Sequence, residues 1–211
     1  MSPVNVLHPL PERSDIYWIE AYDPRTYHAQ SYLLVHPEGN ILIDVPAYRK
    51  EVIRALQEQG GVRYIFITHK DDIGDVGTFQ EFFHARIILH RSEIHYVRDG
   101  QVDVAFDGDL SLYPDVVIVH LPGHTPGSAA LLDLRTPAAL FCGDAINVKD
   151  ARELFVPRHP FDFDARLKRI TLRKLLQYPF EIVLPAHPAH PGLYLPSGGR
   201  QHLEQLLRRI L

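Results

Sequence analysis

Histidine and aspartate residues gather directly after an apolar segment of the sequence. Residues 64–68 are apolar, aromatic or β-branched, and the residues at 69–75 read His-Lys-Asp-Asp-Ile-Gly-Asp. The end of a buried strand, just before a helix, is a common place for binding or catalytic side chains in layered α/β proteins. Imidazole nitrogens and carboxylate oxygens can bind a metal ion, and a hydrolytic metal site adds one open position for water. The segment therefore suggests a metal-dependent site.

Three later segments each place one more potential metal ligand at the end of an apolar run. Residues 122–128 read Pro-Gly-His-Thr-Pro-Gly-Ser, residues 141–144 read Phe-Cys-Gly-Asp, and residues 184–187 read Leu-Pro-Ala-His. A bound cation lowers the pKa of its water from about 15.7 to about 7, which gives hydroxide at neutral pH. A nearby carboxylate can then orient this water or take its proton. Together the four segments predict a metal site, at which such chemistry would be available.

Length and composition narrow the classes of protein. The chain has 211 residues, a formal charge of −4 and one cysteine, Cys142, so we expect one domain over residues 1–211 and no internal disulfide. The charge gives no reason to expect nucleic acid or an anionic membrane as partner. No apolar run approaches about 18 residues, and residues 1–16 lack the apolar core of a signal peptide. We therefore expect a cytoplasmic protein with a small-molecule substrate.

The elements that must position these side chains alternate between strands and helices. We predict strands at 16–21, 30–35, 41–44, 64–68, 86–89, 116–121, 129–134, 138–142 and 182–184, and helices at 50–59, 75–83, 92–97, 164–178 and 201–211. Residues 99–108 are predicted to be a small irregular section, and residues 147–163 a loop over the strand ends. Two hairpins that each end in an acid, at 31–44 and 128–144, suggest two similar halves. The predicted fold is a four-layer α/β/β/α sandwich.

With these segments in this order and spacing, the sequence resembles the metallo-β-lactamase-fold hydrolases, the superfamily that includes glyoxalase II, lactonases and many thioesterases. The resemblance extends from Tyr32 to His187, and residues 122–128 are its most specific part. Asp44 matches a structural acid of the family. The resemblance implies an α/β/β/α sandwich of the metallo-β-lactamase type. It also implies hydrolysis of an ester, thioester, lactone or similar acyl bond through a metal-bound hydroxide.

The first metal-binding motif of this family reads Thr-His-x-His-x-Asp-His, and the present chain departs from it. Asp71 stands at the place of the second His. Without a gap, Ile73 and Gly74 occupy the places of the motif Asp and the last His. With a two-residue insertion, Asp75 matches the motif Asp and Val76 replaces the last His. We prefer the gapped alignment because it keeps an acid at the start of the helix.

The resemblance implies one or two divalent metal ions, which would be zinc, manganese or iron. One cation would be held by His69, Asp71 and His124, and a second by Asp144, which bridges both cations, together with His187 and Asp75. Asp71 and Asp75 are also the candidates for handling the proton of the catalytic water. Replacing a His ligand by Asp makes the site harder and more anionic, which favours iron or manganese over zinc.

Several of these residues have structural alternatives. Asp71 could be a solvated loop acid, and Asp75 could be only the N-cap of a helix, which stabilises a helix by ~1 kcal/mol. Asp72 is interpreted as a surface acid or as an acid that supports a ligand. His159 and His190 are predicted to lie at the surface rather than in the pocket.

Two other functions remain open at this point. A member of this fold with an incomplete second metal site could bind a ligand or partner without turnover. A carboxylate-rich site could also serve an iron-dependent oxidoreductase. The pocket is expected to be open, or covered by residues 147–163 or by a second subunit in a homodimer. Fold alone does not decide between these functions, because function resides in the site.

Overall fold

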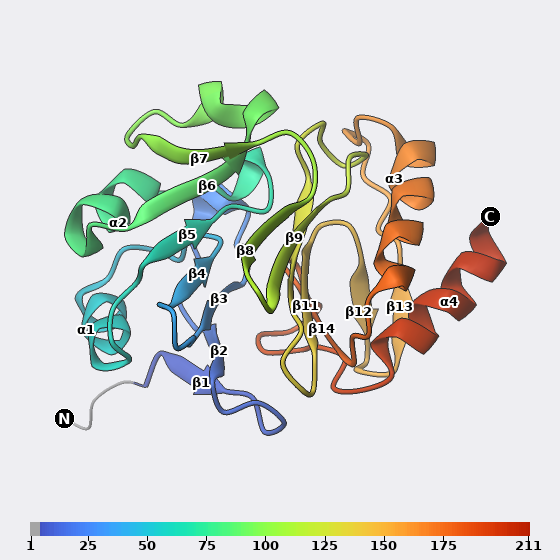
Figure 1. Cartoon of the computed structure of the whole chain (residues 1–211), viewed down its shortest axis with the longest axis horizontal. Helices are drawn as coiled ribbons and strands as arrows, with labels where there is room; N and C mark the ends of the chain where they lie inside the picture. Colours follow the sequence, from blue (N-terminus) through green and yellow to red (C-terminus); the bar gives the residue numbers. More distant parts are fainter. Residues whose placement is uncertain (1–4) are drawn as a thin grey trace. The chain divides into compact units, whose positions relative to one another are not determined.

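The residues of the chain separate into two compact units in the computed structural model, which describes residues 5–211. Unit 1 consists of the chain up to Leu89 together with Ile94–Ala105, and unit 2 consists of His90–Glu93 and Phe106–Leu211. Figure 1 shows the elements of both, coloured along the chain. The prediction that residues 1–16 form no signal peptide concerns residues 1–4 as well, and these four lie outside the described residues. The single domain over residues 1–211 stays a prediction.

Unit 1 is built on a seven-stranded sheet whose strand order equals the order along the chain. The strands are β1 (Leu7–Pro9), β2 (Ile16–Ile19), β3 (Ser31–Leu34), β4 (Ile41–Ile43), β5 (Tyr64–Phe66), β6 (Arg86–His90) and β7 (Val102–Phe106). Strands β1 to β4 pair antiparallel, and β4, β5 and β6 pair parallel. The parallel strands β4 and β5 are buried along their whole length, as expected for strands covered on both faces.

Two helices cover one face of this sheet. The row Leu33, Leu42, Ile65 and Ile87 crosses four neighbouring strands in direct register. It belongs to the same buried cluster as apolar residues of α1 (Lys50–Glu58) and α2 (Val76–Phe83), namely Val52, Ile53, Leu56, Val76 and Phe79. Since the helical residues recur at intervals of three and four, each helix presents an apolar stripe to the sheet.

Unit 2 contains a five-stranded sheet of order β14-β11-β10-β9-β8 and a separate two-stranded hairpin. The strands are β8 (Leu110–Tyr113), β9 (Val116–His120), β10 (Ala129–Asp133), β11 (Ala139–Gly143), β12 (Asn147–Lys149), β13 (Glu153–Phe155) and β14 (Ile182–Pro185). Strands β11 and β14 pair parallel, while the other pairs are antiparallel. The row Val117, Leu132, Leu140 and Val183 crosses the sheet in register.

The helices of unit 2 pack on this sheet through a second buried cluster. They are α3 (Ala165–Thr171), its 3-10 continuation η4 (Leu172–Gln177), and α4 (Gly199–Ile210). Leu203, Leu206 and Leu207 of α4 share the cluster with residues of the sheet. No helix among the described residues is long and apolar enough to cross a membrane.

Most of the predicted elements are present with slightly different ends, and the α/β class is confirmed in both units. The predicted helix at 92–97 is the 3-10 helix η3 (Arg91–Tyr96). The prediction of irregular structure was wrong for residues 99–108, which contain β7, and for residues 147–163, which contain the hairpin of β12 and β13. These strands were missed because they are short or carry charged residues, so their pairing depends on non-local contacts rather than on an apolar pattern.

Candidate functional site

His69 of unit 1 lies between β5 and the 3-10 helix η2 (Lys70–Asp72). Its side chain is buried, with 1% exposed. The carboxylate of Asp44 accepts hydrogen bonds from the backbone N–H and the hydroxyl of Thr68, at 2.8 and 3.0 Å. The same hydroxyl lies 3.1 Å from Nδ1 of His69. Asp44 thus has the structural role predicted from the sequence, because it holds the backbone that delivers His69.

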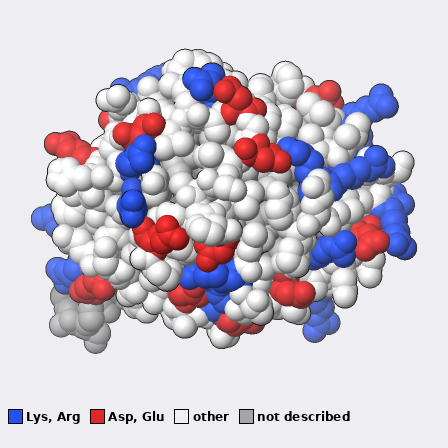
Figure 2. Space-filling model, viewed as in Figure 1, with Lys and Arg blue, Asp and Glu red and all other residues white. Residues whose placement is uncertain are grey.

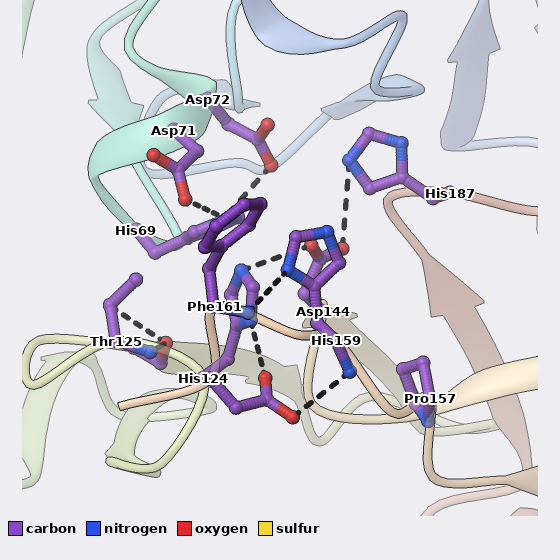
Figure 3. A network of polar contacts seen from close by, with 12 residues as sticks. His69, Asp71, Asp72, His124, Thr125, Asp144, Pro157, His159, Phe161 and His187 are labelled. Carbon is purple, nitrogen blue, oxygen red and sulfur yellow. Dashed lines mark hydrogen bonds and ion pairs between the residues drawn. The ribbon is translucent and has the colours of Figure 1, made fainter. Parts of the chain in front are cut away.

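The acids that follow His69 in η2 have different surroundings. Asp72 is fully buried, and its Oδ2 lies 3.5 Å from Nδ1 of His69. The Oδ2 of Asp71 lies 3.8 Å from the other ring nitrogen, Nε2. The Oδ1 of Asp71 accepts a hydrogen bond from Lys70 Nζ at 2.6 Å. Both acids therefore face His69 (Figure 3), and burial excludes the surface interpretation of Asp72.

Asp75 occupies the N-cap position of α2, but its side chain makes no capping hydrogen bond within the described chain. Its Oδ1 instead accepts a hydrogen bond from Nη1 of Arg25 at 3.0 Å. Arg25 lies in the 3-10 helix η1 (Pro24–Thr26), and its Nη2 also bonds Asp23 at 2.6 Å. The Arg25 guanidinium holds the pKa of Asp23 below its usual value. The side-chain geometry thus supports an ion pair rather than a helix cap for Asp75.

His124 of unit 2 lies in the turn at 122–128 that follows β9. The ring is buried, with 5% of the residue exposed. Its Nδ1 lies 2.8 Å from Oδ1 of Asp162. Its Nε2 lies 3.3 Å from Oδ2 of Asp144 (Figure 3). Because an ionised carboxylate only accepts hydrogen bonds, the proton of the short Nδ1 contact belongs to the ring.

Asp144 and His187 follow two neighbouring parallel strands, β11 and β14. The carboxyl ends of parallel strands lie at the same edge of a sheet, which is where α/β folds place their sites. The Oδ1 of Asp144 lies 3.7 Å from Nε2 of His187. The backbone oxygen of His187 accepts a hydrogen bond from Asn147 Nδ2 at 2.6 Å. Unit 2 thus brings together the three predicted ligands that its sequence contributes.

The turn at 122–128 is held by side-chain contacts of its own. The hydroxyl of Ser128 accepts a hydrogen bond from the backbone N–H of Thr125 at 2.9 Å. The N–H of Gly127 donates to the carboxylate of Glu93 at 2.9 Å, and Glu93 is buried with 1% exposed. These bonds satisfy polar groups that would otherwise be buried without partners, so the turn presents His124 in one conformation.

Asp162, which lies in the predicted loop at 147–163, was not among the predicted site residues. Burial opposes its ionisation, but hydrogen bonds from His124, from the backbone of His159 and from Lys168 outweigh this effect and lower the pKa of Asp162. Asp162 and His124 are 38 residues apart, so no local pattern links them. His159 and His190 are exposed, as predicted, although the ring of His159 lies edge-on to His124 with centroids 5.4 Å apart.

The donor set of unit 2 fits a divalent cation. Nitrogen and oxygen ligands of zinc lie about 2.0–2.2 Å from the metal, so two of them on one cation are roughly 3–3.6 Å apart. The contacts of Asp144 with His124 and with His187, at 3.3 and 3.7 Å, are close to this range. Imidazole and carboxylate donors suit zinc and iron, and carboxylate also suits manganese.

A family model described as "Metallo-beta-lactamase superfamily" matches residues 9–165. The chain belongs to the metallo-beta-lactamase superfamily. The match includes His69, His124 and Asp144 and spans residues of both units. Members of the metallo-beta-lactamase superfamily are mostly metal-dependent hydrolases, as the sequence resemblance implied.

Solved structures of metallo-beta-lactamases show the same fold. The metallo-beta-lactamase from Pontibacter korlensis is 19% identical and gives a TM-score of 0.72, covering 96% of this chain and 99% of that protein. DIM-1 metallo-beta-lactamase is 12% identical with a TM-score of 0.72, covering 98% and 99%. TTHA1623 in a di-iron-bound form is 24% identical with a TM-score of 0.65, covering 83% and 93%. These similarities confirm the predicted metallo-beta-lactamase type of fold.

The chain is also similar in sequence to a curated protein from Bacillus subtilis (strain 168). It is described as "Uncharacterized protein YobT" and is 24% identical over 159 residues, which is 63% of this chain and 68% of the relative. The similarity extends the family relationship but assigns no substrate.

Proposed function

We propose that this protein is a metal-dependent hydrolase that cleaves an ester, thioester, lactone or similar acyl bond. The observation that carries this proposal is the arrangement of His124, Asp144 and His187 in unit 2. Two imidazoles approach one carboxylate at 3.3 and 3.7 Å, and each follows a strand at the place that the family motif requires. The superfamily membership supports the same reaction class.

The proposed metal ligands are His69, Asp71, Asp75, His124, Asp144 and His187. One or two divalent cations would be bound, and the di-iron form of the similar TTHA1623 supports iron beside zinc and manganese. A bound cation would supply Lewis-acid activation of water and polarisation of the acyl carbonyl.

Asp71 and Asp75 are the proposed proton acceptors of the reaction. Their side chains are 29% and 32% exposed, so water can reach both. A carboxylate within hydrogen-bond reach of the attacking water can take its proton in the transition state. Lys70 and Arg25 hold these carboxylates at 2.6 and 3.0 Å, which restricts their orientation.

An iron-dependent oxidoreductase is the second candidate. The acids that follow His69 and the similarity to TTHA1623 in its di-iron form favour it. A third candidate, a binding protein without turnover, is favoured by the basic partners of Asp71 and Asp75, with which a cation must compete.

A small-molecule substrate, a cytoplasmic location and a homodimer stay predictions. On the face drawn in Figure 2, the acidic and basic side chains of the described residues are mixed. This mixture supports the expectation that neither nucleic acid nor an anionic membrane is a partner.

The test combines metal content with turnover. Purified protein is analysed for metals, stripped with a chelator and reloaded with zinc, manganese or iron, and assayed on aryl esters, thioesters and lactones. We expect hydrolysis that disappears on stripping, returns on reloading, and is lost in Asp144→Asn. Asp107→Asn is the matched control, because Asp107 is an acid of unit 2 that is 67% exposed and pairs with Arg91 at 2.9 Å rather than with a candidate ligand. Metal binding without hydrolysis of any acyl substrate would contradict the proposal.

A further inference from the structure

A buried ion pair lies against the Nδ1 edge of His124, opposite the edge that faces Asp144. We propose that Asp162 and Lys168 are positioning residues that set the orientation and the proton-bearing nitrogen of His124 for metal binding. The inference rests on the metal site of the proposed function, but it does not depend on the substrate.

Asp162 is fully engaged by three donors. Its Oδ1 accepts from Nδ1 of His124 at 2.8 Å and from Nζ of Lys168 at 3.1 Å. Its Oδ2 accepts from the backbone N–H of His159 at 3.2 Å. The side chains of Asp162 and Lys168 are 4% and 2% exposed. The carboxylate therefore has few ways to turn away from the imidazole.

Lys168 joins the two ends of the segment that carries Asp162. Besides the bond to Asp162, its Nζ donates to the backbone oxygen of Pro157 at 3.0 Å. Burying an ammonium is costly unless it is paired and hydrogen-bonded, and these two acceptors supply both conditions. Lys168 thus holds the segment at 157–162 against His124.

The backbone adds a second attachment between this segment and the turn of His124. The N–H of Phe163 donates to the oxygen of His124, and the N–H of Asp164 donates to the oxygen of Gly123, each at 2.9 Å. Gly123 has φ +149°, and a Cβ at this position would lie 2.2 Å from Cα of Lys168. Only a glycine allows this close approach, so the register of the two segments is determined.

The chemistry of a metal-binding imidazole explains the arrangement. A neutral ring has one N–H and one lone pair. A carboxylate that accepts from Nδ1–H leaves the lone pair on Nε2, and this is the nitrogen that lies 3.3 Å from Asp144 Oδ2. Carboxylates that accept the second N–H of a ligating His determine its tautomer and increase its basicity.

The first experiment measures the zinc dissociation constant of the apoprotein by competition with a chelator. We expect Asp162→Asn to weaken zinc binding by about 10- to 100-fold, the usual effect of losing such a partner. Asp133→Asn is the matched control, because Asp133 is another buried acid of unit 2, with 0% of its side chain exposed and an Arg135 partner at 2.8 Å. It should destabilise the protein without changing the zinc affinity.

The double variant separates positioning from general stability. Asp162→Asn leaves Lys168 buried without its anion, so the single variant loses stability as well as affinity. Replacing Lys168 by Met in the same chain removes that charge, and the thermal midpoint of the apoprotein should partly recover. The zinc affinity should stay low, because the acceptor for Nδ1–H is still an amide. Recovery of zinc affinity together with stability would overturn the proposal.

A third measurement needs no variant of Asp162. Nitrogen-15 NMR of the histidine rings in the wild-type apoprotein, with the signal of His124 assigned by its loss in His124→Ala, reports which nitrogen carries the proton. We expect protonated Nδ1, and protonated Nε2 would contradict the proposal.

A wild-type protein that binds metal but hydrolyses nothing would refute the proposed hydrolase activity alone. Unchanged zinc affinity in Asp162→Asn would refute the positioning role alone, and wild-type protein that binds no metal would refute both.

Discussion

The segments that carry His69 in unit 1 and His124 in unit 2 use their carboxylates differently. In unit 2, Asp162 and Asp144 contact the two nitrogens of one imidazole, at 2.8 and 3.3 Å. In unit 1, Asp72 and Asp71 also approach the two nitrogens of one imidazole, that of His69, but at the longer distances of 3.5 and 3.8 Å, and Asp71 bonds Lys70 at 2.6 Å. Asp162 also bonds a lysine, Lys168, at 3.1 Å, but both of these side chains are buried, whereas those of Asp71 and Lys70 are 29% and 28% exposed. The carboxylates of unit 2 are thus closer to their imidazole, and the Asp162 pair is better shielded from water than the Asp71 pair.

This difference follows from how much of each family motif is present. The turn at 122–128 retains the motif, and its contacts are buried. In the altered first motif, Asp71 and Asp75 are 29% and 32% exposed, and each pairs with a basic side chain. A cation at these two acids must compete with Lys70 and Arg25. The proposed second metal site therefore departs further from the family motif than the turn at 122–128 does.

His124→Ala should have the largest effect. It removes the proposed nitrogen ligand that lies closer to Asp144, at 3.3 Å against 3.7 Å for His187, so metal content and hydrolysis should be lost together. The apoprotein should keep its fold, because the buried clusters of both units consist of apolar side chains. Metal analysis, an acyl-ester assay and circular dichroism on one preparation check this. If the variant kept its full metal content, His124 would not be a metal ligand, and the contrast between the segments of His69 and His124 would have no bearing on metal binding.

Asp75→Asn should lower hydrolysis by ~10², the usual range for losing a general acid or base, and should reduce the occupancy of the second cation. The free energy of unfolding should change by about 1 kcal/mol or less, because exposed ion pairs contribute little. Steady-state kinetics and metal stoichiometry measure the two effects.

Arg25→Gln is the control for Asp75→Asn, since it breaks the same 3.0 Å ion pair and leaves the carboxylate in place. It should keep the metal. Equal losses in both variants would mean that Asp75 acts only through its ion pair.

Asp71→His should shift the metal preference towards zinc, because it restores the nitrogen ligand of the family motif and removes one negative charge. Competition between zinc and manganese for both apoproteins measures the shift, which we expect to be about tenfold, equivalent to 1.4 kcal/mol. An unchanged ratio of zinc affinity to manganese affinity would show that Asp71 pairs only with Lys70 and is not a metal ligand.

Asp164→Ala should have the smallest effect and should be confined to stability. The Asp164 side chain caps α3 by accepting from the N–H groups of Arg166 and Leu167, each at 2.8 Å, a contact that Asp75 lacks at α2. Loss of such a cap costs ~1 kcal/mol. Urea unfolding measures it, with Asp164→Asn as the variant that retains the cap. A change in zinc affinity in Asp164→Ala would show that the capped helix also controls His124.

Local patterns in the sequence were sufficient to predict most elements and the positions of three candidate ligands of unit 2. Apolar runs that end in a turn with one polar residue predicted that His124, Asp144 and His187 follow strands, and the structure confirms these positions. The signal for these positions is local, because a run of consecutive apolar residues indicates both that a strand is buried and where it ends. The motif at 122–128 is likewise continuous.

The partners of the candidate ligands depend on the tertiary structure. Asp162 lies 38 residues from His124, and Arg25 lies 50 residues from Asp75, so neither contact leaves a periodic signal in the sequence. The burial of Asp72 was equally hidden, because an acid in a polar segment gives no local sign of being enclosed. Sequence identifies which side chains end a strand, while packing between distant segments decides which atoms face them and therefore which nitrogen or carboxylate is available to a metal.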